Sequence, residues 1–90
     1  MGCISIYGYA IVAENGKYIH TEQTGDRDID VYTTDSIDSA DIYDTYDIAR
    51  AEARHMKNNT GKFDYWVSSI PIGVVKIEKT IKIGTVKGLD

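Results

Sequence analysis

The residues best suited to chemistry in this 90-residue chain are aspartates. Residues 26–47 hold eight of them against a single cation, Arg27. Five recur at every third position from Asp35 to Asp47. Carboxylates at this density can ligate a metal ion, work in pairs as acid and base, or present negative charge to a basic partner.

A metal site is the first of these alternatives. Asp26, Asp28 and Asp30 match positions 1, 3 and 5 of a calcium loop. Such a loop needs glycine at position 6 and glutamate at position 12. The chain has Val31 and Ile37 there. We therefore predict no metal and no cofactor.

A catalytic centre is not indicated either. His20 and His55 belong to no catalytic motif, and Cys3 has no cationic neighbour in sequence that would activate its thiol. The glycines are scattered and do not form a phosphate-binding loop. We predict a protein that is not an enzyme.

Residues 3–24 are predicted to form a β-hairpin. Residues alternate in character from Cys3 to Ala13, and Asn15-Gly16 is a strong signal for a two-residue turn. A two-residue turn would place Val12 opposite Ile19. The predicted core face of the hairpin comprises Ile4, Ile6, Ala10, Val12 and Ile19, and the opposite face comprises Tyr7, Tyr9, Ile11, Tyr18 and His20.

Residues 25–44 are predicted to be an acidic connection, with a short strand at residues 28–33. The period of three from Asp35 to Ala49 fits neither a strand nor one amphipathic helix. Thr45 is a good N-cap, so a helix is predicted over residues 45–58 and is expected to stop near Gly61.

The C-terminal strands are predicted within residues 62–83, with a tail at residues 84–90. Lys62–Ile70 is expected to form one strand, which Pro71 and Gly73 break. Val74–Ile83 is the second, and Lys79 in its apolar face predicts a bulge or an edge position.

These elements predict an α+β fold in a single domain, residues 1–90. We expect a small, mostly antiparallel sheet of three to five strands with one helix packed on one face, in the order ββ(β)αββ. No stretch approaches 18 apolar residues, no secretory signal is recognised at the start, and there is one cysteine. We therefore expect a cytoplasmic protein that does not enter membranes.

The net charge of −4 is unevenly distributed. Residues 1–48 hold ten acids and two bases, whereas residues 49–90 hold four acids and eight bases. The overall acidity argues against direct binding to duplex nucleic acid, where phosphate neutralisation supplies the affinity. We predict instead an acidic surface that binds a protein partner, formed by Asp26, Asp28, Asp30, Asp35, Asp38 and Asp41.

Two other hypotheses use the seven tyrosines. One is a nucleotide binder in which Tyr7, Tyr9, Tyr18 or Trp66 stacks on a base. The other is a homodimer formed through an aromatic sheet face. The phosphate contacts in the first hypothesis are Arg50, Arg54 and Lys76, and the predicted aromatic surface is Tyr7, Tyr9, Tyr18 and Tyr32.

Three segments resemble small phage-encoded α+β proteins. They are the hairpin YAIVAENGKYI (Tyr9–Ile19), the acidic connection TTDSIDSADIYDT (Thr33–Thr45) and the helix YDIARAEA (Tyr46–Ala53). Proteins of this type often inhibit host machinery, and anti-CRISPR and other anti-defence inhibitors are among them. The resemblance implies that inhibitor class. Regularly spaced carboxylates can imitate the phosphates of a nucleic acid, so together with the resemblance they lead us to expect a host protein as partner: a nuclease, a CRISPR effector or another nucleic-acid-binding protein whose basic site is occluded.

Overall fold

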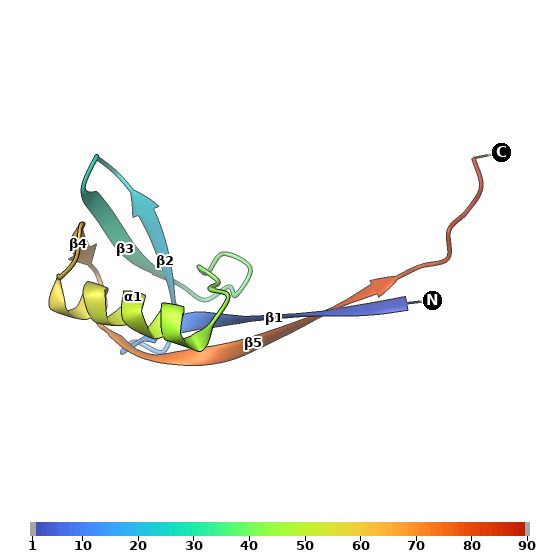
Figure 1. Ribbon diagram of the computed structural model, residues 1–90, viewed down its shortest axis with the longest axis horizontal. Coiled ribbons are helices and arrows are strands. Elements are labelled where there is room, and N and C mark those ends of the chain that lie inside the picture. The colour runs from blue at the N-terminus through green and yellow to red at the C-terminus, as the bar shows by residue number, and fades with distance from the viewer. Residues whose placement is uncertain (1, 90) are drawn as a thin grey trace.

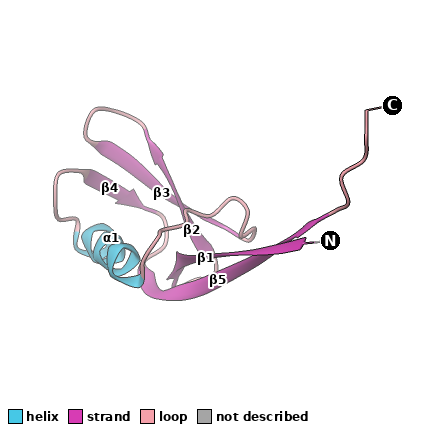
Figure 2. Ribbon diagram, turned by 45° about the vertical axis from the view of Figure 1, so that its right-hand side comes forward, coloured by secondary structure: helices cyan, strands magenta, loops and turns pink. Residues whose placement is uncertain are grey.

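The computed structural model describes residues 2–89 and has an α+β fold with a curled, mixed five-stranded sheet (Figure 1). The strand order across the sheet is β4-β3-β2-β1-β5. A single helix in the described part of the chain packs on one face of the sheet, as Figure 2 shows. Along the chain the elements are β1 (Gly2–Ala13), β2 (Tyr18–Gln23), β3 (Asp28–Thr34), α1 (Tyr46–Asn58), β4 (Asp64–Val67) and β5 (Pro71–Ile83).

The predicted class is confirmed, but the predicted sheet is only partly right. Three neighbouring strand pairs are antiparallel, whereas β4 runs parallel to β3. A parallel pair requires a crossover between its strands. Residues 35–63, which include α1, supply that crossover.

The hairpin between β1 and β2 has a different turn from the predicted one. Ala13 and Lys17 close a three-residue loop, and Gly16 adopts φ of 81°. Val12 therefore pairs with Tyr18 instead of Ile19. A one-residue change of register reverses which face of the second strand meets a given face of the first.

The core consequently differs from the predicted one. Ile11 and Ile19 are fully buried on the helix side of the sheet, with Val31, Ala49 and Met56 around them. Ile11 was predicted on the exposed face. Two residues of the predicted core face, Ile4 and Ile6, are 49% and 50% exposed.

The helix α1 closely matches its prediction. The Thr45 hydroxyl accepts a hydrogen bond from the backbone N–H of Ile48, and Asp47 lies in the first turn, where an acid is favoured. The helix ends at Asn59, which has φ of 52° and accepts a hydrogen bond from the Tyr65 N–H at 2.8 Å. The cap is therefore Asn59, within the segment predicted to stop the helix, and Gly61 has the positive φ predicted for it, 96°.

The C-terminal strands start and stop at other points than predicted. The strand predicted over Lys62–Ile70 is limited to β4. Pro71 and Gly73 do not interrupt a strand, because both belong to β5. Pro71 is tolerated since it begins a strand at the edge of the sheet. The pairing of Lys79 with Ile6 is regular, so only the predicted edge position holds and not the bulge.

The start of β1 and the end of β5 lie side by side, far from α1 (Figure 1). β1 and β5 pair along almost their whole length, from Gly2 with Ile83 to Ala13 with Pro71. The molecule extends 55 Å, and its radius of gyration is 16.4 Å. A compact domain of this length has a radius of gyration of about 12 Å. Residues 84–89 follow β5 without regular structure, and Asp90, the end of the predicted tail, lies outside the described residues.

Candidate functional site

The part of the acidic connection that follows β3, from residue 35 on, fills the space between β1 and β2. These two strands pair only next to their turn. Asp41 donates its backbone N–H to the carbonyl of Ile19 on the β2 side. Tyr43 exchanges two backbone hydrogen bonds with Tyr9 on the β1 side, at 2.8 and 2.9 Å. The segment 41–43 thereby ties the two diverging strands together.

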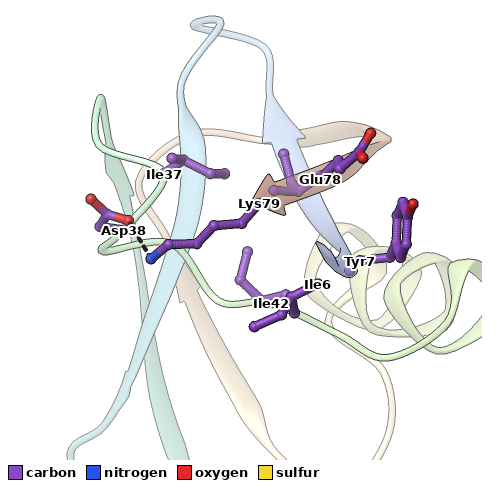
Figure 3. A pocket seen from close by; sticks show the side chains of 9 residues that line it. Ile6, Tyr7, Ile37, Asp38, Ile42, Glu78 and Lys79 are labelled. Atoms are coloured by element: carbon purple, nitrogen blue, oxygen red, sulfur yellow. Dashed lines mark ion pairs between the residues drawn. The ribbon is translucent and has the colours of Figure 1, made fainter. Parts of the chain in front are cut away.

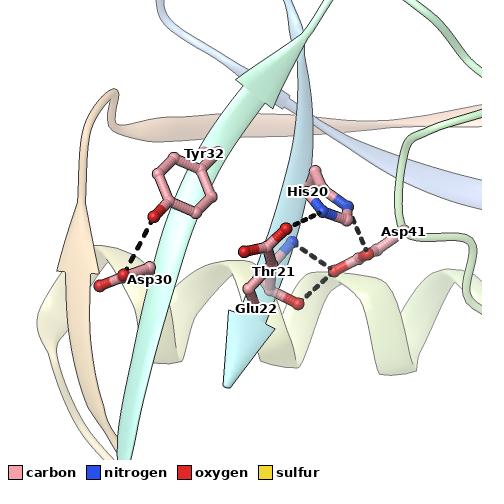
Figure 4. Close-up of polar contacts among 6 residues, drawn as sticks. All are labelled: His20, Thr21, Glu22, Asp30, Tyr32 and Asp41. Carbon is pink, nitrogen blue, oxygen red and sulfur yellow. Dashed lines mark hydrogen bonds and ion pairs between the residues drawn. The ribbon is translucent and has the colours of Figure 1, made fainter. Parts of the chain in front are cut away.

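Asp41 belongs to this structural tie. Its Oδ2 accepts hydrogen bonds from the backbone N–H of Thr21, at 3.0 Å, and from the Thr21 hydroxyl (Figure 4). Its Oδ1 lies 3.5 Å from Nδ1 of His20. Its side chain is only 25% exposed. Asp41 therefore takes part in a contact that ties the connection to β2.

Two further aspartates of the connection pair with lysines. Asp35 lies 3.6 Å from Lys17, and Asp38 lies 3.6 Å from Lys79. Both carboxylates are exposed, at 83% and 79%. Exposed pairs of this kind contribute little stability, about 0–1 kcal/mol. They do, however, reduce the net negative charge that this part of the surface presents.

The remaining predicted aspartates lie on or beside the face of the sheet opposite α1. Asp28 and Asp30 alternate with the core residues of β3 and so project from this face. Asp26 is exposed in the loop just before β3. We call one set of side chains on the sheet the acidic face: Glu22, Asp28, Asp30, Asp64, Tyr32 and Trp66.

The strand register brings the members of the acidic face together. Glu22 of β2 is opposite Asp30 of β3, and Trp66 of β4 is opposite Asp30 on the other side. Asp28 is opposite Asp64. Neighbouring strands are about 4.8 Å apart, so four carboxylates converge on a small area.

Hydrogen bonds hold the two aromatic rings against these carboxylates. The Tyr32 hydroxyl donates to Asp30 Oδ2 at 3.0 Å, as Figure 4 shows, and Trp66 Nε1 donates to Asp28 Oδ1 at 3.3 Å. The hydrogen bond and charge of Asp30 raise the pKa of Tyr32. Both rings remain open to solvent, since Trp66 is 65% exposed and Tyr32 is 43% exposed.

The acidic face has no internal cationic partner among residues 2–89. None of its four carboxylates lies within 4 Å of a lysine or an arginine, and Glu22 pairs only with His20, at 3.2 Å. Within the same residues no cluster of histidine, cysteine and carboxylate side chains is arranged to hold a metal ion. The surface therefore combines uncompensated negative charge with two exposed aromatic rings.

The sequence prediction missed two carboxylates of the acidic face, and the structure divides the aromatic surface that was predicted as one. Glu22 and Asp64 are far from the aspartate-rich segment and join it only through strand pairing. The predicted aromatic surface is divided, because Tyr18 and Tyr32 lie opposite α1 while Tyr7 and Tyr9 lie on its side. The alternation along each strand and the observed register of the hairpin cause this division.

The predicted phosphate contacts lie on the helix side. Arg50 and Arg54 line a hollow of about 230 Å³ together with Ile72 of β5. The Lys76 ammonium lies 4.9 Å from the centre of the Tyr7 ring, a cation–π contact. The Tyr9 ring makes an edge contact with Tyr46, with centroids 6.2 Å apart. The acidic face and these three basic side chains thus lie on opposite sides of the sheet.

In the described part of the chain, α1 is too short and too polar to cross a membrane. The chain matches no protein-family model, no curated protein and no solved structure.

Proposed function

We propose that the protein is a non-enzymatic binding module whose acidic face occludes a basic site on a nucleic-acid-processing protein. The observation that carries the proposal is the convergence of four carboxylates and two exposed aromatic rings, with no lysine or arginine partner among residues 2–89. Such a surface attracts the same basic grooves that attract nucleic acid. A host defence protein, as in phage inhibition, is the partner class that we favour.

The two aromatic rings add apolar contact area to a face whose carboxylates supply the charge. Tryptophan and tyrosine are the side chains most enriched among those that dominate binding energy. Trp66 and Tyr32 lie among carboxylates that would pair with arginine or lysine of the partner. Charge would govern the rate of association, and ring burial would slow dissociation.

The test compares two charge-matched triple variants. Glu22→Gln/Asp30→Asn/Asp64→Asn removes three charges from the acidic face. Asp35→Asn/Asp38→Asn/Asp44→Asn removes three from the connection. Wild type and both variants serve as bait in host lysate, and captured proteins are identified by mass spectrometry and then bound to each bait in purified form.

We expect a nucleic-acid-binding protein that binds the wild type and the connection variant, binds the acidic-face variant at least tenfold more weakly, and is released by duplex DNA. The acidic-face variant should also show a shallower dependence of affinity on salt. A partner that binds both variants equally, or that duplex DNA does not displace, contradicts the proposal.

A nucleotide-binding function is the second candidate, in a reduced form. Tyr18 and Trp66 are on the side opposite Arg50, so base stacking would fall to Tyr7 or Tyr46, beside Lys76 and the arginines. Titration calorimetry with a panel of nucleotides tests this candidate. Heat of binding that is lost in Arg50→Ala/Arg54→Ala supports it, and no heat from any nucleotide contradicts it.

A further inference from the structure

The outer parts of β1 and β5 form a two-stranded ribbon that projects beyond the rest of the sheet (Figure 1). We call residues 2–7 and 78–83 the arm. Every residue of the arm is exposed, unlike the segment 10–13 of β1 in the body of the sheet. An isolated two-stranded ribbon is marginally stable in water, so an arm of this length calls for a covering surface.

The two faces of the arm differ in polarity. Directly paired residues share a face, and the pairs Ile4 with Ile81 and Gly2 with Ile83 lie on one of them. We call this the aliphatic face; Ile6 and Lys79 extend it toward the body. The opposite face is more polar and carries Cys3, Ser5, Tyr7, Glu78, Thr80 and Lys82.

The aliphatic face continues into a pocket where the arm joins the body. This pocket measures about 300 Å³ and is lined by Ile6, Ile37, Ile42 and Ile77, among others (Figure 3). The Lys79 ammonium reaches Asp38 at 3.6 Å, so the charge is paired and its methylene stem remains in the apolar stripe. Tip and pocket thus form one continuous aliphatic surface.

The exposed part of this surface is large for so small a protein. Ile4, Ile6, Ile42, Ile81 and Ile83 are each 40–50% exposed. Together they present roughly 400 Å², within the range of the largest apolar patch on a typical monomer. Two copies would bury roughly 800 Å² from these side chains alone, and the surrounding atoms bring the total toward the ~1,200 Å² of a stable interface.

The shape of the patch favours a second copy of the chain as the covering surface. It joins an aliphatic tip, Ile81 and Ile83, to an aliphatic pocket lined by Ile37 and Ile42. An arm placed over the pocket of another copy therefore brings isoleucines onto isoleucines. Lys79 is the arm lysine on this face and already pairs with Asp38, so the contact buries no unpaired arm charge.

We propose that the protein forms a two-fold dimer in which the aliphatic faces of two arms pack against each other in antiparallel directions. The tip of each arm, Ile81 and Ile83, covers the pocket of its partner. The same patch serves both copies, so the contact closes and does not propagate. The acidic face stays outside the interface, and this inference is independent of the proposed partner.

Paired glutamate substitutions on the two faces of the arm test the dimer. Ile4→Glu/Ile81→Glu places charge in the aliphatic face. Ser5→Glu/Thr80→Glu places the same charge one residue away, on the polar face. Sedimentation velocity over a wide concentration range gives the dissociation constant of each, and circular dichroism melting shows whether the body remains folded.

We expect a dimer for the wild type and for Ser5→Glu/Thr80→Glu, and at least a tenfold weaker dimer for Ile4→Glu/Ile81→Glu, with α1 intact in all three. A wild-type monomer at several hundred micromolar overturns the proposal. Equal weakening by both variants overturns it as well, because it would place the interface elsewhere.

The single cysteine provides an independent measurement on the unaltered sequence. Cys3 is exposed on the polar face, pointing away from the proposed contact. In the antiparallel arrangement the two Cys3 Cα atoms lie roughly 15–20 Å apart, from the ~3.4 Å rise per residue and ~10 Å between packed sheets. Spin labels on Cys3 should report one intermolecular distance in that range, after allowance for the label arms. A distance above 40 Å, or none, contradicts the arrangement.

Discussion

The Cγ2 methyl of Ile42 occupies the space into which a side chain at Gly8 would project. Gly8 is buried in β1 and pairs with Ile77 of β5, at the point where the arm meets the body of the sheet. The adjacent backbone pair of Tyr9 and Tyr43 fixes the connection at the same level. Ile42 therefore seats the acidic connection on β1 only because residue 8 lacks a side chain.

Gly8→Ala should consequently destabilise the protein. A Cβ at residue 8 would collide with Ile42 and displace the connection, at a cost of about 1–3 kcal/mol in the free energy of unfolding. Gly73→Ala is the control, because a Cβ at Gly73 meets nothing within 4 Å. Urea unfolding measures both variants. Equal stability of the two would show that the contact with Ile42 is easily relieved.

Asp41→Ala should also destabilise the fold, unlike substitution of its neighbours in the connection. It removes the acceptor of the Thr21 N–H and hydroxyl, and leaving such partly buried donors unpaired costs about 1–3 kcal/mol. Asp38→Ala, which loses only an exposed ion pair, should cost about 0–1 kcal/mol. Denaturant unfolding compares them. A similar loss for both variants would contradict the structural role of Asp41.

The protein should lose stability at alkaline pH through its buried tyrosines. Burial, followed by the charge of Asp41, raises the pKa of Tyr43 in the fold, and burial with Glu52 raises the pKa of Tyr65. Tyrosine in the unfolded chain has a pKa of about 10. The stabilising effect is therefore fully present below pH ~10 and is lost as the pH rises toward the folded-state value, by up to about 1.4 kcal/mol per pH unit for each tyrosine.

Thermal unfolding between pH 7 and 11.5 measures this effect. Tyr43→Phe should flatten the alkaline decline, and Tyr7→Phe, at a ring that is 55% exposed, is the matched control. A decline that begins well below pH 9, or one that Tyr43→Phe leaves unchanged, would point to another titrating group.

The sequence by itself determined the local elements. The Thr45 cap and the apolar spacing of α1 act within a few residues, and the structure confirms that helix. Alternation placed β3 within one residue of its observed end. The period of three from Asp35 correctly excluded a single helix over that segment, since α1 begins only at Tyr46.

Tertiary structure decided the rest, because strand partners are chosen by contacts between residues far apart in sequence. The three-residue loop between Ala13 and Lys17 shifted the hairpin register by one residue and so changed which side chains form the core. The parallel pairing of β4 with β3 brought Asp64 and Trp66 to Asp28 and Asp30.

The aspartates show the same division. Their number and position were evident in the sequence, but their environments were not. Asp41 accepts hydrogen bonds from Thr21, Asp38 pairs with Lys79, and Asp30 accepts a hydrogen bond from the exposed Tyr32. A carboxylate's surroundings depend on which distant strand or loop is packed against it, and no local pattern specifies that neighbour.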